Sequence, residues 1–314
     1  MGGRGLMRIA FLGTPEFALP SLSALYDAGH TLAVFTQPDR PVGRRAVITP
    51  SAVKRLALSL DLPVYCFEKL RGEEGLQALR GFAPELVVTC AFGQFLSRKC
   101  LELPPLGTIN VHASLLPRYR GASPIQSAVI AGERETGVTT MLTSLRMDEG
   151  DILLQDKTEI GENETYGELS DRLSMMGARL LIRTVDEYAG GRLTPIPQDN
   201  RLATVCHMLT KDDGRIDFNK GAKEVHDLIR GTQPWPEAFA MLDGQPLKLI
   251  ASRLLPDLDA QGEAGILRCF DRTRLALRCA DAWLEILTLQ SPGGKRLSAA
   301  DYMRGKPLNG KLLL

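Results

Sequence analysis

The sequence predicts an α/β fold, a mostly parallel β-sheet with helices on both faces, followed by a small β-barrel. Three observations support this prediction. The first two-thirds of the chain alternate short β-branched runs with segments of helical spacing, which is typical of strands joined by crossover helices. Residues 189–210 then lose this pattern and are punctuated by prolines. The remaining residues form short strand-like runs separated by glycine turns, as in small barrels.

The strands of the first region are expected where β-branched and apolar residues cluster. They are Arg8–Leu12, Thr31–Thr36, Leu62–Cys66, Glu85–Cys90 and Thr108–Val111. Helical spacing lies between them, at Pro20–Ala28, Ser51–Leu60 and Glu73–Arg80. Gly29 follows the first helix, where a C-cap is expected. Ligands of parallel sheets bind beyond the carboxyl ends of the strands, so we expect the site at that edge.

Two further strands and a long helix are expected to complete the first domain. The strands are Gly137–Leu145 and Asp151–Ile160, and they face each other across a turn at Arg146–Gly150. The helix spans Thr165–Tyr188. We therefore expect a first domain at residues 1–190, a linker at 191–209, and a barrel domain similar in kind to an OB-fold at 210–314. One amphipathic helix, Ala222–Gly231, is expected to open that second domain.

Composition limits the function classes. A chain of 314 residues favours two domains, and its net charge of +1 supplies no overall field that would attract nucleic acid. Any contact with nucleic acid must then come from local patches. The six cysteines form no C-x-x-C pair, so reduced thiols are expected, with no disulfide framework and no zinc site. The amino terminus lacks the apolar region of a signal peptide, and no run approaches membrane-spanning length. These features predict a cytoplasmic protein, monomeric and without metal or membrane.

The most informative stretch lies at the end of the strand that precedes residue 113. Asn110 and His112 are two residues apart, so their side chains leave the same face of the strand. An amide and an imidazole at a carboxyl strand end suit stabilisation of an oxyanion and proton transfer. Spacing alone leaves an alternative open, in which Asn110 caps the following loop and His112 satisfies a buried carbonyl.

The turn Met147–Asp151 carries three carboxylates between two strands. One interpretation is that a carboxylate of this turn reaches the His112 side chain as a base or an orienting group. The alternative is that an aspartate in a turn hydrogen-bonds its own backbone. Spacing does not decide between the two.

Five segments together resemble the signature of the folate-dependent formyltransferases. They are Asn110–His112, Ser114–Pro117, Arg120–Gln126, Glu135–Thr139 and Asp148–Ile152. The resemblance extends from Arg8 to the end of the chain. It implies a Rossmann-like first domain that binds 10-formyltetrahydrofolate, an OB-like second domain, and no metal.

The resemblance also implies roles for individual residues. Asn110, His112 and Asp148 match the catalytic residues of the family. The stretch bordering the formyl-folate site comprises Ser114, Leu115, Leu116 and Pro117. Phe92 and Gly93 match walls of the pteridine pocket. In the implied reaction a neutral amine attacks the formyl carbonyl, Asn110 and His112 stabilise the developing negative charge, and Asp148 pairs with His112.

Two regions resemble the branch of the family that formylates the methionine of initiator methionyl-tRNA. Phe11–Ala18 and Phe35–Pro41 match its opening strands and loop. The expected tRNA-binding groups are basic residues of an exposed loop and of the second domain: Arg40, Arg44, Arg45, Lys295 and Arg296. A merely solvated surface loop is the alternative reading. The loop departs from this branch after Arg44, where it lacks the usual pair of lysines.

The second region, Gly214–Phe218 with Ile229–Ala238, resembles the carboxyl-domain signature of this branch, although Gln233 and Glu237 replace the usual asparagine and glycine. A nucleotide-sugar N-formyltransferase that uses the same folate donor is the alternative within the family. A nicotinamide dehydrogenase is disfavoured because Phe11–Pro15 lacks G-x-G-x-x-G. A tRNA-binding module without activity is the remaining alternative, although the three expected catalytic residues are all present.

Overall fold

We describe a computed structural model that covers residues 5–43, 46–255, 261–270 and 273–314 of the chain. It divides into two compact units. The first contains residues up to 121 together with 137–158 and 170–205. The second contains 122–136, 159–169 and 206–314. The sequence-based division into 1–190, 191–209 and 210–314 remains a prediction about the folding domains.

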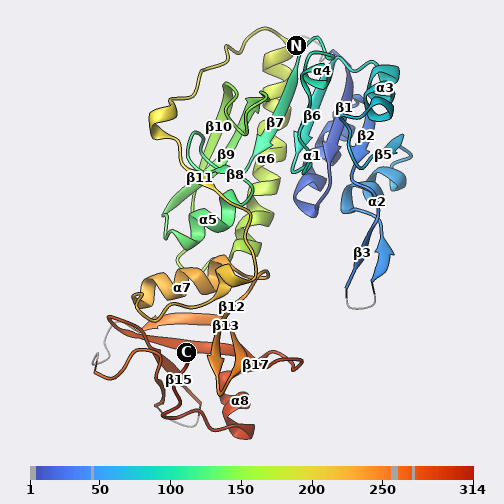
Figure 1. Cartoon of the computed structure of the whole chain (residues 1–314). Helices are drawn as coiled ribbons and strands as arrows, with labels where there is room; N and C mark the ends of the chain where they lie inside the picture. The colour runs from blue at the N-terminus through green and yellow to red at the C-terminus, as the bar shows by residue number, and fades with distance from the viewer. Residues whose placement is uncertain (1–4, 44–45, 256–260, 271–272) are drawn as a thin grey trace. The chain divides into compact units, whose positions relative to one another are not determined.

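A seven-stranded sheet forms the centre of the first unit, in the order β10-β9-β7-β6-β1-β2-β5 (Figure 1). Five neighbouring strands are parallel: β1 (Arg8–Gly13), β2 (Thr31–Thr36), β5 (Val64–Cys66), β6 (Leu86–Cys90) and β7 (Thr108–His112). Next to β7 lies antiparallel β9 (Glu135–Leu142), and β10 (Ile152–Glu159) follows it at the edge. The expected mostly parallel sheet is confirmed. Its order places the carboxyl ends of β6 and β7 side by side.

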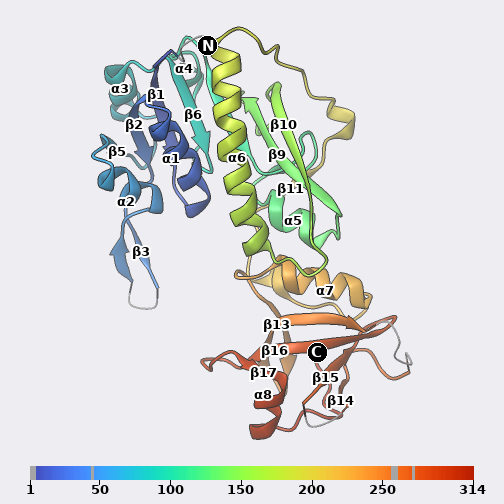
Figure 2. The same ribbon diagram turned by 180° about the vertical axis from the view of Figure 1, so that it is seen from behind.

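Helices cover both faces of this sheet. The helical elements here are η1 (Glu16–Ala18), α1 (Leu19–Asp27), α2 (Ala52–Ser59), α3 (Glu73–Phe82), α4 (Arg98–Leu101) and α6 (Tyr166–Ala189). Ala10 and Leu12 pack with Leu76 and Leu79 of α3 in one buried cluster. Strand alternation turns the residues between them toward the opposite face. In the view of Figure 2, α1 and α6 lie in front of the strands.

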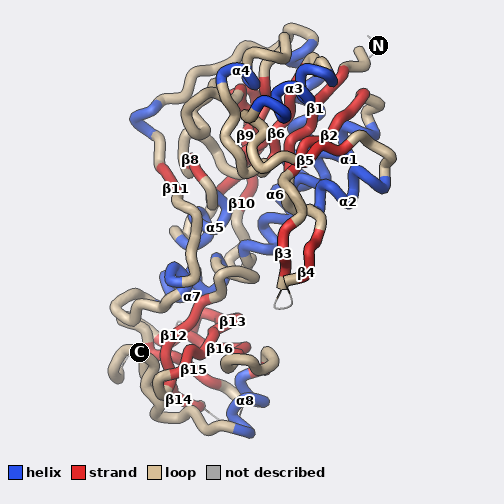
Figure 3. The backbone as a smooth tube through the Cα atoms, turned by 45° about the vertical axis from the view of Figure 1, so that its right-hand side comes forward, coloured by secondary structure: helices blue, strands red, loops and turns tan. Residues whose placement is uncertain are grey.

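Residues 40–49 form a hairpin, although the sequence analysis expected only an exposed loop. The strands β3 (Arg40–Val42) and β4 (Val47–Thr49) pair in antiparallel register and extend beyond the sheet (Figure 3). The β-branched run Val47–Thr49, which follows Gly43 in the sequence, is the local signal that favours this pairing. Arg44 and Arg45, which come between the two strands in the sequence, lie outside the described residues.

The second unit contains a curled antiparallel sheet in the order β12-β13-β16-β15-β14, with β17 paired to β16. Its strands are β12 (Ala238–Leu242), β13 (Gln245–Leu255), β14 (Leu267–Cys269), β15 (Leu275–Arg278), β16 (Trp283–Gln290) and β17 (Leu297–Ser298). The last residues of the chain join its two edges. Leu314 exchanges backbone hydrogen bonds of 2.6 and 2.9 Å with Met241, and the Leu313 N–H donates to the Gly265 carbonyl at 2.9 Å. The expected small C-terminal barrel is confirmed.

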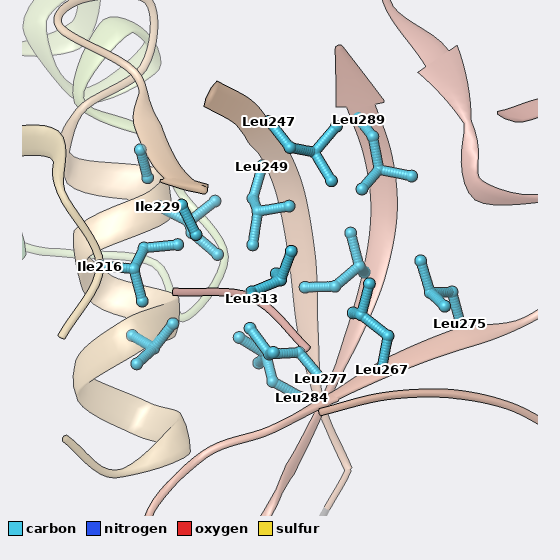
Figure 4. Packing of buried hydrophobic residues seen from close by; sticks show 14 of the residues in the cluster. Ile216, Ile229, Leu247, Leu249, Leu267, Leu275, Leu277, Leu284, Leu289 and Leu313 are labelled. Carbon is cyan, nitrogen blue, oxygen red and sulfur yellow. The ribbon is translucent and has the colours of Figure 1, made fainter. Parts of the chain in front are cut away.

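Apolar side chains fill this barrel and the helix that covers it. Ile229 of α7 (Ala222–Gly231) packs with Ile216, Leu249 and Leu313 in one buried cluster (Figure 4). Two more helices belong to this unit, α5 (Pro124–Ile130) and α8 (Ala299–Gly305). α5 packs closely on α7, because a Cβ on Gly231 would lie 2.6 Å from the Ile130 side chain.

The segment that follows α6 contains more structure than its sequence suggests. Ile196 forms an antiparallel bridge with Ile152, the first residue of β10. The short strand β11 (Val205–Cys206) pairs with β8 (Arg120–Gly121). Two 3-10 turns also belong to this part of the chain, η2 (Asn200–Leu202) and η3 (Asp212–Gly214). Irregular backbone of this kind is fixed by contacts that are distant in sequence, which local pattern cannot predict.

None of the helices in the described ranges is long and apolar enough to cross a membrane. Within the same ranges, no group of three or more His, Cys, Asp and Glu side chains is placed to hold a metal ion.

A buried histidine predicts how the second unit responds to acid. His226 is 2% exposed, with Nδ1 2.9 Å from the Ser252 hydroxyl and Nε2 3.2 Å from the Glu162 carbonyl. Burial lowers the pKa of His226 from its usual 6.5. The unfolded chain therefore takes up this proton at higher pH than the folded chain does. The contribution of neutral His226 to the free energy of unfolding is therefore complete above pH 6.5, and it is lost as the pH falls below that value.

We expect the Tm of the wild-type chain to fall more steeply between pH 7.5 and 5.5 than that of His226→Gln, which cannot titrate. Thermal unfolding of both proteins at matched ionic strength measures the difference. Parallel Tm profiles would contradict this assignment.

Candidate active site

Asn110 lies at the carboxyl end of β7, opposite Thr89 of β6 in the sheet register. The Thr89 hydroxyl donates a 2.7 Å hydrogen bond to Asn110 Oδ1. Since this contact uses the amide oxygen as acceptor, the Asn110 Nδ2 group is the one left to donate. A strand-end amide held in this way can donate to a carbonyl oxygen of a bound substrate.

His112 follows on the same face of β7 and is 6% exposed. Its Nε2 lies 2.9 Å from the Tyr119 carbonyl, and its Nδ1 lies 3.7 Å from Asp148 Oδ2. A carbonyl can only accept, so Nε2 carries a hydrogen. This assignment turns Nδ1 toward the carboxylate, at an ion-pair separation that is longer than a hydrogen bond.

Asp148 lies in the tight turn between β9 and β10, with a positive φ of 53°. Its Oδ2 accepts a 2.8 Å hydrogen bond from the Gly121 N–H. Gly150 is required two residues later, because a Cβ there would lie 1.6 Å from the Leu142 carbonyl oxygen. The turn is therefore compact, and it presents the Asp148 carboxylate to His112.

The structure brings His112 and Asp148 together, as one interpretation of the sequence required. Part of the alternative also holds, because His112 does satisfy a carbonyl, but this contact uses only one ring nitrogen. Asp148 Oδ2 bonds an N–H that is 27 residues away, outside its own turn. The arrangement joins an amide donor to an imidazole–carboxylate pair, which suits attack of an amine on a carbonyl group.

The loop expected to border the folate site is held by its own hydrogen bonds. Ser114 is fully buried, and its hydroxyl donates to the Arg118 carbonyl at 2.7 Å. The Ser114 carbonyl accepts from the Thr139 hydroxyl at 2.6 Å. Leu116 is also buried, whereas Leu115 and Pro117 are half-buried. Ser114 and Leu116 therefore shape the loop, and the half-buried pair are the side chains placed to contact a ligand.

Phe92 and Gly93 follow the carboxyl end of β6. The Phe92 ring belongs to the buried cluster under α3 and does not face the surface. The Phe92 carbonyl accepts from the Thr14 hydroxyl at 3.0 Å and from Gln37 Nε2 at 3.2 Å. Gly93 is exposed with a φ of +77°, and a Cβ there would lie 2.7 Å from Gln37 Nε2. Backbone at these positions, rather than the Phe92 ring, is available as a pocket wall.

Two family models match the chain. "Formyl transferase" covers residues 7–185, and "Formyl transferase, C-terminal domain" covers residues 208–307. Relatives named methionyl-tRNA formyltransferase match nearly the full length. The one from Pelobacter propionicus is 45% identical over 98% of this chain and 95% of its own. The one from Solibacter usitatus is 45% identical over 96% of each chain.

This chain belongs to the formyl transferase family. Solved structures share its fold at low identity. An N-formyltransferase from Helicobacter canadensis in complex with folinic acid and dTDP-3-aminofucose matches 93% of this chain and 100% of its own, with a TM-score of 0.68 and 17% identity. HypX from Aquifex aeolicus in complex with tetrahydrofolic acid matches 98% of this chain and 49% of its own, with a TM-score of 0.66 and 16% identity.

The basic residues expected to bind tRNA have different surroundings in this formyltransferase. Arg40 in β3 forms a 2.6 Å ion pair with Glu68, and Arg296 in the second unit lies 2.5 Å from Glu237. Lys295 is exposed. Glu237 is buried and also contacts Lys248, so it offsets part of the local positive charge.

Two residues that contact the expected catalytic residues were not predicted from the sequence. Thr89 had a signal, because it is a polar residue inside the apolar run Leu86–Cys90. Gln198 had none, because it lies in the irregular segment after α6. It contacts the Asp148 turn, as described below.

Proposed function

We propose that this formyltransferase moves the formyl group of 10-formyltetrahydrofolate to the amino group of methionine carried on initiator tRNA. One observation carries the proposal: the relatives named methionyl-tRNA formyltransferase match at 45% identity across both units. The geometry supports the same chemistry, because an amide donor and an imidazole–carboxylate pair share the end of the sheet.

The residues present fit a formyl folate. Asn110 supplies a donor for a carbonyl oxygen, and exposed backbone at Gly93 with the half-buried Leu115 and Pro117 supplies a mixed polar and apolar surface. The bound folate supplies an activated carbonyl on nitrogen. Asn110 Nδ2 donates to the carbonyl oxygen as negative charge develops there.

The His112–Asp148 pair handles the proton of the attacking amine. Because Nε2 of His112 is held on the Tyr119 carbonyl, its Nδ1 and the Asp148 carboxylate are the groups that share a proton. The pair accepts the proton that the amine loses and returns it to the departing nitrogen, so no proton is gained or lost overall. This differs from the role implied by the resemblance, because oxyanion stabilisation here falls to Asn110 rather than to His112.

The tRNA is proposed to contact the β3–β4 hairpin and basic groups of the second unit. Arg40 is exposed in the hairpin, and arginines suit contacts with backbone phosphates, which position a nucleic acid without reading its sequence. Arg40, Arg44, Arg45, Lys295 and Arg296 are the proposed contacts. We also propose a monomeric, cytoplasmic enzyme.

Arg44→Ala is expected to raise the KM for charged tRNA and leave the KM for formyl folate unchanged. Loss of one phosphate contact should also reduce the slope of log affinity against log salt by about 1. Arg98→Ala is the matched control, because it removes an exposed arginine of α4 in the same unit. An unchanged KM for tRNA in the Arg44 variant would remove Arg44 from the proposed tRNA interface.

The proposed function is tested with formyl folate as donor and three acceptors: methionyl initiator tRNA, methionyl elongator tRNA and an amino-sugar nucleotide. We expect rapid formylation of the initiator tRNA alone. Activity confined to the amino-sugar nucleotide would replace the proposal with the alternative. If none of the three acceptors is formylated, the proposed function of this chain is wrong.

A further inference from the structure

The Gln198 side chain connects a buried arginine to the turn that carries Asp148. Its Nε2 donates to the Asp148 carbonyl at 2.8 Å and to the Gly150 carbonyl at 2.7 Å. Its Oε1 accepts from Arg120 Nε at 3.0 Å and from Nη2 at 2.7 Å. The Gln198 amide thus makes these four hydrogen bonds to Arg120 and the turn, and its Nε2 also lies 3.9 Å from Met141 Sδ. All of these residues belong to the first unit.

The orientation of this amide is fixed by chemistry. A guanidinium has only donors, so the Gln198 oxygen must face Arg120. A backbone carbonyl only accepts, so the Gln198 NH₂ must face the turn. Reversing the amide would oppose donors to donors and acceptors to acceptors, and this excludes the flipped orientation.

The turn requires support of this kind. Asp148 has a positive φ of 53°, a conformation that costs a non-glycine residue about 1 kcal/mol or more. Carbonyls in such a turn have no regular ladder to join, so each needs another donor. Gln198 satisfies the carbonyls of Asp148 and Gly150, on both sides of Glu149.

Arg120 is a firm anchor for Gln198. It is 5% exposed, and its Nη2 also donates to Asn200 Oδ1 at 2.8 Å. The next residue, Gly121, donates its N–H to the Asp148 carboxylate. Gln198 therefore holds the main chain of Asp148, and Gly121, which follows Arg120, holds its side chain.

We propose that Gln198 is a positioning residue for the His112–Asp148 pair, and that the segment after α6 thereby completes the active site. This inference rests on the proposed function. Gln198 does not touch the reacting atoms. It acts by fixing the Asp148 backbone, and so keeps the carboxylate in reach of His112 Nδ1.

Gln198→Glu tests the inference because it keeps the shape and the Arg120 contact but replaces the amide donors with a carboxylate. We expect kcat to fall roughly 10- to 100-fold, the loss typical of a misplaced catalytic group, with both KM values within about twofold. Asn200→Asp is the matched control. It makes the same chemical change on another acceptor of Arg120, and should leave kcat within about twofold.

A double-mutant cycle separates positioning from a general structural defect. If Gln198 acts through Asp148, adding Gln198→Glu to Asp148→Asn should lower kcat no further. The inference would be overturned if the losses of kcat in the two single variants multiply in the double variant. It would also be overturned if the kcat of Gln198→Glu lies within twofold of wild type. Gln198→Met removes the donors without adding charge, and provides the same test if the glutamate variant does not fold.

A crystal structure of the Gln198 variant gives a readout that is independent of substrate. We expect the distance from His112 Nδ1 to the Asp148 carboxylate to increase beyond 3.7 Å. An unmoved carboxylate would overturn the inference even if the wild-type enzyme failed to formylate tRNA. Such a failure, by contrast, would refute the proposed function alone.

Discussion

Asp148→Asn is expected to lower kcat by roughly 100- to 10,000-fold, the range for loss of a general acid–base group. The asparagine oxygen can still accept from the Gly121 N–H, so the turn should keep its conformation. The same Oδ2 atom lies nearest His112 Nδ1, so the amide oxygen would take its place there, and an amide oxygen cannot accept the proton of the attacking amine. Steady-state formylation kinetics measure the loss, and thermal unfolding checks the fold.

Glu149→Gln is the control for that substitution, because it neutralises the adjacent carboxylate of the same turn. Glu149 lies 3.6 Å from Arg120 Nη1 and 3.4 Å from Arg146 Nη1, so its contacts are ion pairs at the rim of the turn. Its removal should change kcat by less than about threefold. Near-normal turnover in Asp148→Asn would remove Asp148 from the mechanism.

The second large effect is expected for Asn110→Ala, which should lower kcat roughly 100- to 1000-fold through loss of the oxyanion donor. The KM for formyl folate should change much less, because the interaction strengthens only as charge develops. Thr89→Val should give a smaller loss, about three- to tenfold, because it removes only the hydrogen bond that orients Asn110.

The relative loss of kcat in these two variants shows how strongly Asn110 depends on Thr89. If Thr89→Val lowers kcat as much as Asn110→Ala does, the Asn110 amide depends entirely on the Thr89 hydroxyl for its orientation. An Asn110→Ala enzyme within a few-fold of wild type would show that the carbonyl oxygen is stabilised elsewhere.

Much of the fold follows from local pattern. Apolar runs such as Glu85–Cys90 and Thr108–Val111 identified the central parallel strands, because buried strands need continuous apolar sequence. The β3–β4 hairpin was missed because its short strands are exposed and carry no core-facing alternation. The closure of the barrel by Leu313 and Leu314 was also unpredictable, since it depends on pairing between distant segments.

The candidate site was only partly accessible from sequence. The spacing of Asn110 and His112 predicts a shared face, and a carboxylate turn was identified, but only the resemblance selected Asp148. Spacing could not show that His112 Nε2 is already bonded to Tyr119, which changes the role of the imidazole. Nor could it show that Gln198 reaches the turn, because that contact spans 50 residues of the chain.

The central claim is that Asn110, His112 and Asp148 act on one formyl carbonyl. A crystal structure with a stable 10-formyl folate analogue, in the absence of tRNA, tests it most directly. We predict that the formyl oxygen lies about 2.7 to 3.1 Å from Asn110 Nδ2, with the His112–Asp148 pair beside the formyl carbon. A formyl group bound away from Asn110, with the pair directed elsewhere, would contradict the account.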